Sequence, residues 1–329
     1  MDALKQRASG LRSRIVFPEA EDDRIMHAVK LASRSDITRP LLMGRGEVLA
    51  EKAAREGIPK AKFDIVDPEH SPYLARYARM YSRMFHASQS VSEKIMKNTL
   101  FMGAMSVAAG DAQGLIAGAV YTSAELISVS RSIIGLHKGF TMPSSFFIMS
   151  VPGYAGGDKG VLIFADCSVN PSPCPNALAD TAIATCQSAR RLLRWTPRAA
   201  MLSFSTKGSA SHAEVEKVAK AVEIAKRREP KLMIDGELQA DAALVMSTAK
   251  RKMGGKLGPV AGRANILIFP DLDAGNIAYK LVNILAGANA YGPILQGFAK
   301  PVSDLSRGAT PEDIVGAITV LSILIGGAR

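Results

Sequence analysis

Short aliphatic runs alternate with amphipathic segments along most of this 329-residue chain. Residues 14–17, 41–43, 63–66 and 115–117 are predicted strands, and the segments between them, such as 24–32, have helical periodicity. Strands separated by helices are typical of a parallel sheet with helices on both faces. The alternation therefore predicts an α/β fold, and the length favours two domains over one.

The alternation changes in the middle of the chain. Two predicted strands, 144–151 and 161–166, are joined only by a short Gly-rich link, which indicates an antiparallel hairpin. Further strands are then predicted at 199–204, 232–235, 265–269 and 293–296, with helices at 213–227 and 276–285. Because 135–143 has the composition of a loop, we expect a domain boundary near residue 140.

Basic residues outnumber acidic ones by 41 to 30, and the net charge of +11 suggests an anionic partner. Nucleic acid is not favoured, because aromatic residues make up only 6% of the chain and the sequence has no basic tail and no zinc-finger spacing. The longest apolar stretch, 314–328, is shorter than the roughly 20 residues that a membrane span needs. We expect it to form a buried C-terminal helix, with no membrane contact.

Cysteine usage and the N-terminus bear on the compartment. The three cysteines, Cys167, Cys174 and Cys186, are too few and too irregularly spaced for a disulfide framework. The first residues lack the apolar region of a signal peptide, so we expect a cytoplasmic protein. Five scattered histidines form no evident ligand set, so no metal is expected.

Four polar clusters follow predicted strands, at the positions where parallel α/β sheets bind ligands. Thr122 and Ser123 are able to hold a phosphate at a helix start, although an N-cap is the favoured interpretation. Residues 235–239 and 271–276 carry paired carboxylates, which suit acid–base chemistry and equally suit the start of a helix.

The fourth cluster, 300–313, is the most informative. Its Arg307 is suited to hold a phosphate or a developing oxyanion, and its Asp313 is suited to accept a proton. The same segment also resembles a capping box, with Thr310 as N-cap and Asp313 at the third helical position. The two roles of Asp313 are compatible.

At these loops the sequence resembles the phosphate acetyltransferase (phosphotransacetylase) family, which includes phosphate butyryltransferases. The matching stretches are 164–170, 201–209, 235–243, 269–277, 291–297 and 306–308, and the likeness runs from Val16 to the C-terminal helix. The family reaction is acetyl-CoA + phosphate ⇌ acetyl phosphate + CoA. CoA is a substrate of this reaction, which needs no tightly bound cofactor and no metal.

The resemblance also implies an architecture. It predicts two three-layer α/β domains with an interdomain cleft, like isocitrate dehydrogenases, and a homodimer. The first domain would hold residues 1–140 plus 293–329, and the second would hold residues 141–292.

The family motifs assign roles to single residues of this chain. Asp313 matches the base that deprotonates the CoA thiol, whose thiolate then attacks acetyl phosphate directly. Ser306 and Arg307 match the Ser-Arg pair that orients the acyl phosphate and stabilises negative charge. Arg83 matches a CoA-phosphate-binding arginine, and Cys167 matches a cysteine that lines the site without acting as a nucleophile.

One position departs from the family pattern. Relatives carry an arginine in the helix that follows Thr122 and Ser123, and this chain has Ser128 there. Arg131 lies three residues later on the same helix face, so its guanidinium is able to reach back one turn and replace the family arginine. Two alternatives to the family reaction stay open: a non-catalytic module that senses acetyl-CoA, and an acyltransferase that prefers propionyl or butyryl groups.

Overall fold

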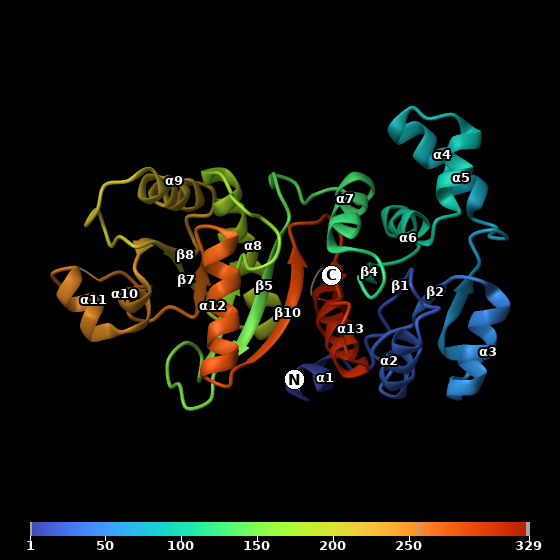
Figure 1. Cartoon of the computed structure of the whole chain (residues 1–329), viewed down its shortest axis with the longest axis horizontal. Coiled ribbons are helices and arrows are strands. Elements are labelled where there is room, and N and C mark those ends of the chain that lie inside the picture. The colour runs from blue at the N-terminus through green and yellow to red at the C-terminus, as the bar shows by residue number, and fades with distance from the viewer. Residues whose placement is uncertain (1, 256, 327–329) are drawn as a thin grey trace. The chain divides into compact units, whose positions relative to one another are not determined.

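The computed structural model describes residues 2–255 and 257–326, and the chain divides into two compact units (Figure 1). The first unit holds the chain up to His137 together with the segment that begins at Phe298, and the second holds Lys138–Gly297. As a description of folding domains, the division into 1–140 plus 293–329 and 141–292 stays a prediction.

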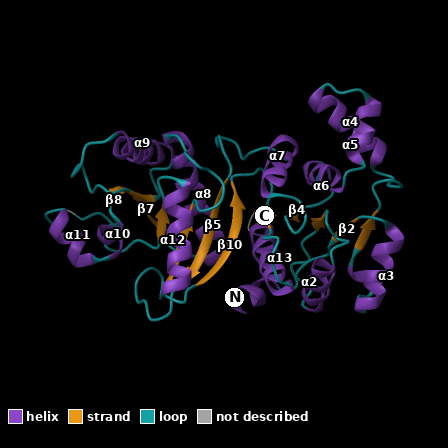
Figure 2. Ribbon diagram, in the orientation of Figure 1, coloured by secondary structure: helices purple, strands orange, loops and turns teal. Residues whose placement is uncertain are grey.

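A five-stranded sheet forms the centre of the first unit (Figure 2). Its strands are β1 (Ile15–Phe17), β2 (Leu41–Met43), β3 (Asp64–Val66), β4 (Gly114–Ala117) and β11 (Val302–Asp304), in the order β11-β4-β1-β2-β3. All of the neighbouring strands are parallel. Strands β1, β2 and β4 are apolar and buried throughout, as parallel strands covered on both faces are.

Helices connect and cover these strands. They are α1 (Asp2–Ala8), α2 (Asp23–Arg34), α3 (Gly46–Glu56), α4 (Leu74–Phe85), α5 (Gln89–Met96), α6 (Thr99–Ala108), α7 (Ser123–Ile133) and α13 (Pro311–Gly326), with a 3-10 turn at Lys60–Lys62. Helix α13 is apolar on nearly every face and packs against α1 and α2. The predicted buried C-terminal helix is therefore confirmed for 314–326, and residues 327 and 328 lie outside the described residues.

The second unit has a six-stranded mixed sheet in the order β10-β5-β6-β9-β7-β8. Its strands are β5 (Ser144–Ser150), β6 (Val161–Ala165), β7 (Arg198–Leu202), β8 (Met233–Leu238), β9 (Ile266–Ile268) and β10 (Asn289–Gln296). Strands β5 and β6 form the predicted antiparallel hairpin, and β10 pairs antiparallel with β5. The pairs β6–β9, β9–β7 and β7–β8 are parallel.

The helices described in the second unit are α8 (Pro175–Leu193), α9 (Ala213–Arg228), α10 (Ala240–Leu244), α11 (Met246–Lys252) and α12 (Leu272–Leu285). The aromatic rings of Phe147 and Tyr279 stack at 4.4 Å between centroids, which joins α12 to β5. In the part of the chain that the structure describes, no helix is both long and apolar enough to cross a membrane.

Three strands differ from the sequence prediction. Strand β10 begins at Asn289, four residues before the predicted strand 293–296. Strand β8 continues through Leu238, so Asp235 and Glu237 lie within a strand rather than at a helix start. Strand β11 was not predicted, because two of its three residues, Ser303 and Asp304, are polar although all three are buried. Alternation and hydrophobicity identify strands, and a short polar strand carries neither signal.

Candidate active site

Three loops of the first unit follow β1, β4 and β11, which are neighbours in the sheet. The loops span 18–22, 118–122 and 305–310. Because the strands are parallel, their carboxyl ends lie at one edge of the sheet, where ligands bind in this class of fold. A cavity of about 210 Å³ is lined there by residues that include Glu19, Gly44 and Tyr121.

The Glu19 carboxylate organises the loop that follows β4. It is only 6% exposed and accepts four backbone N–H groups, two on each oxygen. Oε2 accepts from Gly118 and Ala119 at 2.9 Å each, and Oε1 accepts from Val120 at 2.8 Å and from Tyr121 at 2.5 Å. A single buried carboxylate therefore fixes the whole backbone segment that leads into α7.

Replacing Glu19 with glutamine is expected to destabilise the protein, because the new amide group faces two N–H donors that it cannot accept. Each buried donor left unpaired costs about 1–3 kcal/mol, so the free energy of unfolding should fall by at least about 2 kcal/mol. Urea unfolding measures the change. The control is Glu21→Gln, which removes a half-exposed ion pair with Arg45 and should change stability by less than about 1 kcal/mol. Equal losses in the free energy of unfolding for the two variants would contradict the structural role assigned to Glu19.

The guanidinium of Arg24 forms hydrogen bonds with residues of all three loops. It donates to the carbonyl oxygen of Arg307 at 2.6 Å and to that of Ala119 at 3.2 Å. It also pairs with Asp22 at 2.7 Å, and this hydrogen bond holds the pKa of the Asp22 carboxyl below its usual range. Arg24 thereby holds the backbone at Arg307 in position relative to the loop after β4.

Ser306 and Arg307 lie exposed on the loop between β11 and α13. The Ser306 hydroxyl accepts the Gly308 N–H at 3.2 Å. Among the described residues no carboxylate forms an ion pair with the Arg307 guanidinium. Its backbone is held by Arg24 while its side chain is available to an anion.

Asp313 forms the expected capping box at the start of α13. Its Oδ2 accepts the Thr310 N–H at 2.9 Å and the Thr310 hydroxyl at 2.8 Å, and Thr310 accepts the Asp313 N–H at 3.2 Å. The carboxylate is exposed, and among the described residues Oδ2 is the oxygen that accepts both bonds from Thr310. The cap therefore fixes the position of a carboxylate that remains open to solvent.

Thr122 is the N-cap of α7 and forms a capping box with Glu125, so this interpretation is confirmed. The Ser123 hydroxyl donates to Oδ2 of the buried Asp304 at 2.5 Å. Both residues stand at the carboxyl edge of the sheet, beside the loop of Ser306 and Arg307. Their contact with a phosphate stays a prediction.

The carboxyl group of Asp304 has a raised pKa. It is 5% exposed, and its Oδ1 has no hydrogen-bond partner among the described residues. Burial raises the pKa of Asp304 to about 6, against the opposing effect of the hydrogen bond from Ser123. The native carboxyl therefore retains its proton up to a higher pH than the unfolded one does.

This titration predicts a pH dependence of stability. From about pH 4 to about pH 6 the native state binds more protons than the unfolded state, so the Asp304 contribution falls as pH rises. Asp304→Asn removes this pH-dependent contribution. As the pH is raised from about 4 to about 6, the free energy of unfolding of the variant should therefore increase relative to that of the wild type by on the order of 1–3 kcal/mol. Urea unfolding at several pH values tests this. The control Asp36→Asn should change little relative to wild type over this range, because Lys62 holds the pKa of Asp36 below its usual value and the contribution of Asp36 is lost only as the pH falls below about 4.

The structure does not bring the two predicted CoA-binding arginines into contact with these loops. Arg83 is exposed in the last turn of α4, and Arg131 is exposed in the last turn of α7. Neither forms a hydrogen bond or ion pair with Ser306, Arg307 or Asp313 among the described residues. Ser128 is also exposed on α7, three residues before Arg131.

The second unit carries the other predicted residue, Cys167. Cys167 follows β6 in the chain, and its thiol is fully buried in the apolar core of the unit. Burial, together with the neighbouring Asp166 carboxylate, raises the pKa of Cys167 far above its usual value, which disfavours a thiolate nucleophile. Its contact with CoA stays a prediction.

Buried carboxylates also fix the loops of the second unit. Asp166 accepts backbone N–H groups from Ser145, Ser168, Val169 and Asn170. Glu237 accepts the Ser205 hydroxyl at 3.2 Å and the Gly208 N–H at 2.6 Å. The paired carboxylates at 235–239 therefore act as structural acceptors, with Asp235 paired to Lys207 at 2.7 Å. No group of three or more potential metal-binding side chains occurs within the described ranges.

Sequence reasoning missed Glu19, Arg24 and Asp304. The stretch Phe17-Pro18-Glu19-Ala20 follows a strand, so a carboxylate at a sheet edge was a usable signal for Glu19. Arg24 and Asp304 have no comparable local signal.

The chain belongs to the family of acyltransferases described as phosphate acetyl/butaryl transferase, whose model matches residues 1–322. It is 44% identical to the phosphate acetyltransferase of Thermoanaerobacterium thermosaccharolyticum over 98% of both chains. It is 42% identical to that of Clostridium acetobutylicum, over 97% of this chain and 96% of the relative. The solved phosphotransacetylase from Streptococcus pyogenes superposes with a TM-score of 0.92 at 33% identity, covering 98% of this chain and 97% of that one. The family identified from the sequence motifs is therefore confirmed.

Proposed function

We propose that this protein is a phosphate acetyltransferase that interconverts acetyl-CoA and phosphate with acetyl phosphate and CoA. The observation that carries the proposal is the loop after β11. The loop presents the guanidinium of Arg307, which pairs with no carboxylate among the described residues, and the first turn of α13 presents the capped, exposed carboxylate of Asp313 six residues later. The net charge of +11 suits three anionic substrates, and the two curated relatives described above have this activity in their names.

The proposed chemistry is direct acyl transfer in a ternary complex. Asp313 accepts the proton of the CoA thiol, and the thiolate sulfur attacks the carbonyl carbon of acetyl phosphate. A carbon–sulfur bond forms, the bond from that carbon to the phosphate oxygen breaks, and phosphate leaves with the bonding pair. Arg307 and Ser306 hold the phosphate and stabilise the charge that develops on oxygen.

A steady-state assay tests this function. CoA release is followed from acetyl-, propionyl- and butyryl-CoA in the presence of phosphate, and we expect turnover that requires phosphate and favours the acetyl thioester. A hydrophobic pocket separates substrates that differ by one methylene by only about 1–3 kcal/mol, so the three rates are compared as kcat/KM. Binding of acetyl-CoA without turnover would support the sensing module instead.

Arg131 is proposed to replace the family arginine that is absent at Ser128. Both positions are exposed one turn apart on α7. Arg131→Ala should raise KM for CoA or phosphate several-fold, and adding Ser128→Arg should restore it. The matched control is Arg79→Ala, which removes another exposed arginine and should leave both KM values unchanged. Unchanged constants for Arg131→Ala would refute this replacement.

We also propose that the protein is a homodimer. Helix α12 exposes Ile277, Leu281, Ile284 and Leu285, which recur on one face of the helix. Ile284 and Leu285 are 74% and 80% exposed, and an apolar face of this kind is typical of an interface. A solution mass of one 35.0 kDa chain would contradict the dimer.

A reducing cytoplasm is the proposed compartment. The three cysteines are free thiols, and the exposed Cys174 has no disulfide partner among the described residues. Fractionation of cells that produce the protein should recover it with cytoplasmic markers, and recovery with an oxidising compartment would contradict this placement.

A further inference from the structure

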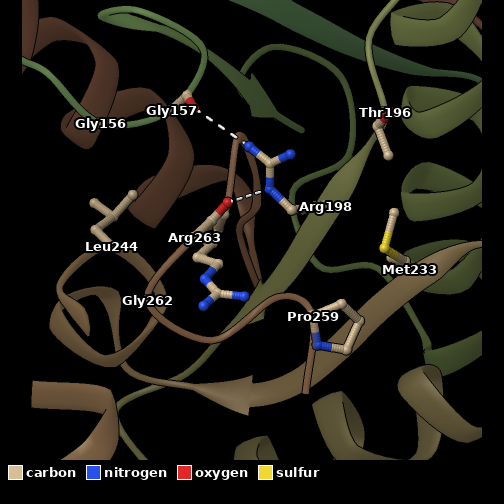
Figure 3. Close-up of a pocket in the computed structure, with 10 residues that line it drawn as sticks. Gly156, Gly157, Thr196, Arg198, Met233, Leu244, Pro259, Gly262 and Arg263 are labelled. Atoms are coloured by element: carbon tan, nitrogen blue, oxygen red, sulfur yellow. Dashed lines mark hydrogen bonds between the residues drawn. The ribbon is translucent and has the colours of Figure 1, made fainter. Parts of the chain in front are cut away.

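The second unit contains a cavity of about 520 Å³ at the amino ends of its parallel strands. Arg198 begins β7, Met233 begins β8, and Arg263 lies just before β9 (Figure 3). The polar loops described above for this unit, such as 203–209, follow the carboxyl ends of the same strands. The cavity is therefore at the opposite edge of the sheet from those loops.

Two arginines give this cavity an uncompensated positive charge. Within the described residues neither Arg198 nor Arg263 forms an ion pair, and no aspartate or glutamate lines the cavity. Nε of Arg198 donates to the carbonyl oxygen of Arg263 at 2.5 Å, and Nη2 donates to that of Gly157 at 3.3 Å. These acceptors are neutral, so two like charges share one recess without a counter-ion. An anion that enters the recess gains from both of them.

The arginine heads are also suited to bind an anion. Arg198 is half-buried and held by two loops before any ligand arrives, so binding costs little ordering of its side chain. A guanidinium has five N–H donors, and these bonds leave the others for a ligand. Figure 3 shows the Arg263 guanidinium unattached to the other labelled residues, with Pro259 and Met233 on further walls of the cavity.

We propose that this cavity binds a small organic anion that is not a substrate of the reaction. A carboxylate, phosphate or phosphonate group pairs with Arg198 and Arg263, and an apolar body contacts Met233, Leu244 and Pro259. The proposal does not depend on the proposed acyl transfer, because its residues have no part in that chemistry. Such a ligand binds together with CoA rather than in place of it.

Phenylphosphonate is a suitable probe, since it combines an anionic head with an apolar ring. In a titration followed by amide NMR of the ¹⁵N-labelled protein, we expect saturable shifts at Gly157, Gly262 and Ala264, with the same dissociation constant when CoA is saturating. Benzyl alcohol, which has the ring without the charge, should produce no saturable shift. Absence of shifts with phenylphosphonate, equal shifts with benzyl alcohol, or loss of the shifts with CoA would each overturn the proposal.

A variant pair locates the binding site. Arg263→Ala removes an exposed side chain that holds no described loop, and it should weaken phenylphosphonate binding at least tenfold, equivalent to about 1.4 kcal/mol. Arg227→Ala removes an exposed arginine from the last turn of α9 and should leave the dissociation constant unchanged. Unaltered amide spectra elsewhere establish that each variant is folded. An unchanged constant for Arg263→Ala, or an equal loss for both variants, would overturn the assignment.

Discussion

Asp313→Asn is expected to lower turnover by about 10²–10⁴-fold, the usual contribution of a general base. The fold should be preserved, because an asparagine oxygen is able to accept the N–H and hydroxyl of Thr310 that Oδ2 accepts in the wild type. The measurement is kcat for the phosphate-dependent release of CoA, with a thermal melt of the same sample. A large loss of kcat with an unchanged melting temperature separates the role of base from the role of cap.

The matched control removes the cap and keeps the carboxylate. Thr310→Ala deletes the hydroxyl that pairs with Asp313 and should cost about 1 kcal/mol of stability, as the loss of an N-cap does. We expect its kcat to fall far less than that of Asp313→Asn. Should Asp313→Asn retain wild-type turnover, Asp313 is a capping residue only.

Arg307→Ala is expected to reduce kcat/KM for acetyl phosphate by about 10²–10³-fold, the usual effect of removing a donor to a developing oxyanion. Arg307→Lys keeps the charge and should still lose about tenfold, because an ammonium group cannot reproduce the bidentate fork of a guanidinium. The comparison is informative because the position of the loop depends on the Arg307 carbonyl, which Arg24 holds whatever side chain is present.

A control for Arg307 comes from another exposed arginine of the same unit. Arg45 follows β2 and pairs with Glu21 on the surface, so Arg45→Ala should leave kcat/KM near the wild-type value. If Arg307→Lys has wild-type kinetics, a point charge is sufficient at this position. If Arg307→Ala also has wild-type kinetics, the Arg307 side chain does not contact the acyl phosphate.

Much of the fold was predictable because its strands carry a strong local signal. The run Leu41–Met43 is wholly apolar and was predicted with its observed bounds, and the 144–151 and 161–166 hairpin followed from its short Gly-rich link. Val302–Asp304 was missed because it is buried through its neighbours rather than through its own composition. A strand that contains a serine and an aspartate is recognisable only when β4 lies beside it.

The candidate site also contains residues that the local sequence predicts and residues that it does not. Ser306, Arg307 and Asp313 were predicted because they lie within eight residues of one another in the sequence and match the family motifs. The residues that hold this loop act over long separations in sequence: 283 residues between Arg24 and Arg307, and 181 between Ser123 and Asp304. Contacts of this range depend on the folded chain, so periodicity and spacing carry no information about them.

The bonds that Arg24 and Glu19 make to the loops after β4 and β11 have one property in common. They end on main-chain atoms: carbonyl oxygens for Arg24, and amide nitrogens for Glu19. A main-chain atom is present whatever residue occupies the position, proline's missing N–H apart. Side chains on these loops can therefore be exchanged while the main-chain bonds are kept, except at Gly118, where a Cβ atom would clash with the Asp304 carboxylate. Substitutions at these loop positions can therefore be used to seek a preference for a different acyl group or a different anion while the loop backbone keeps its conformation.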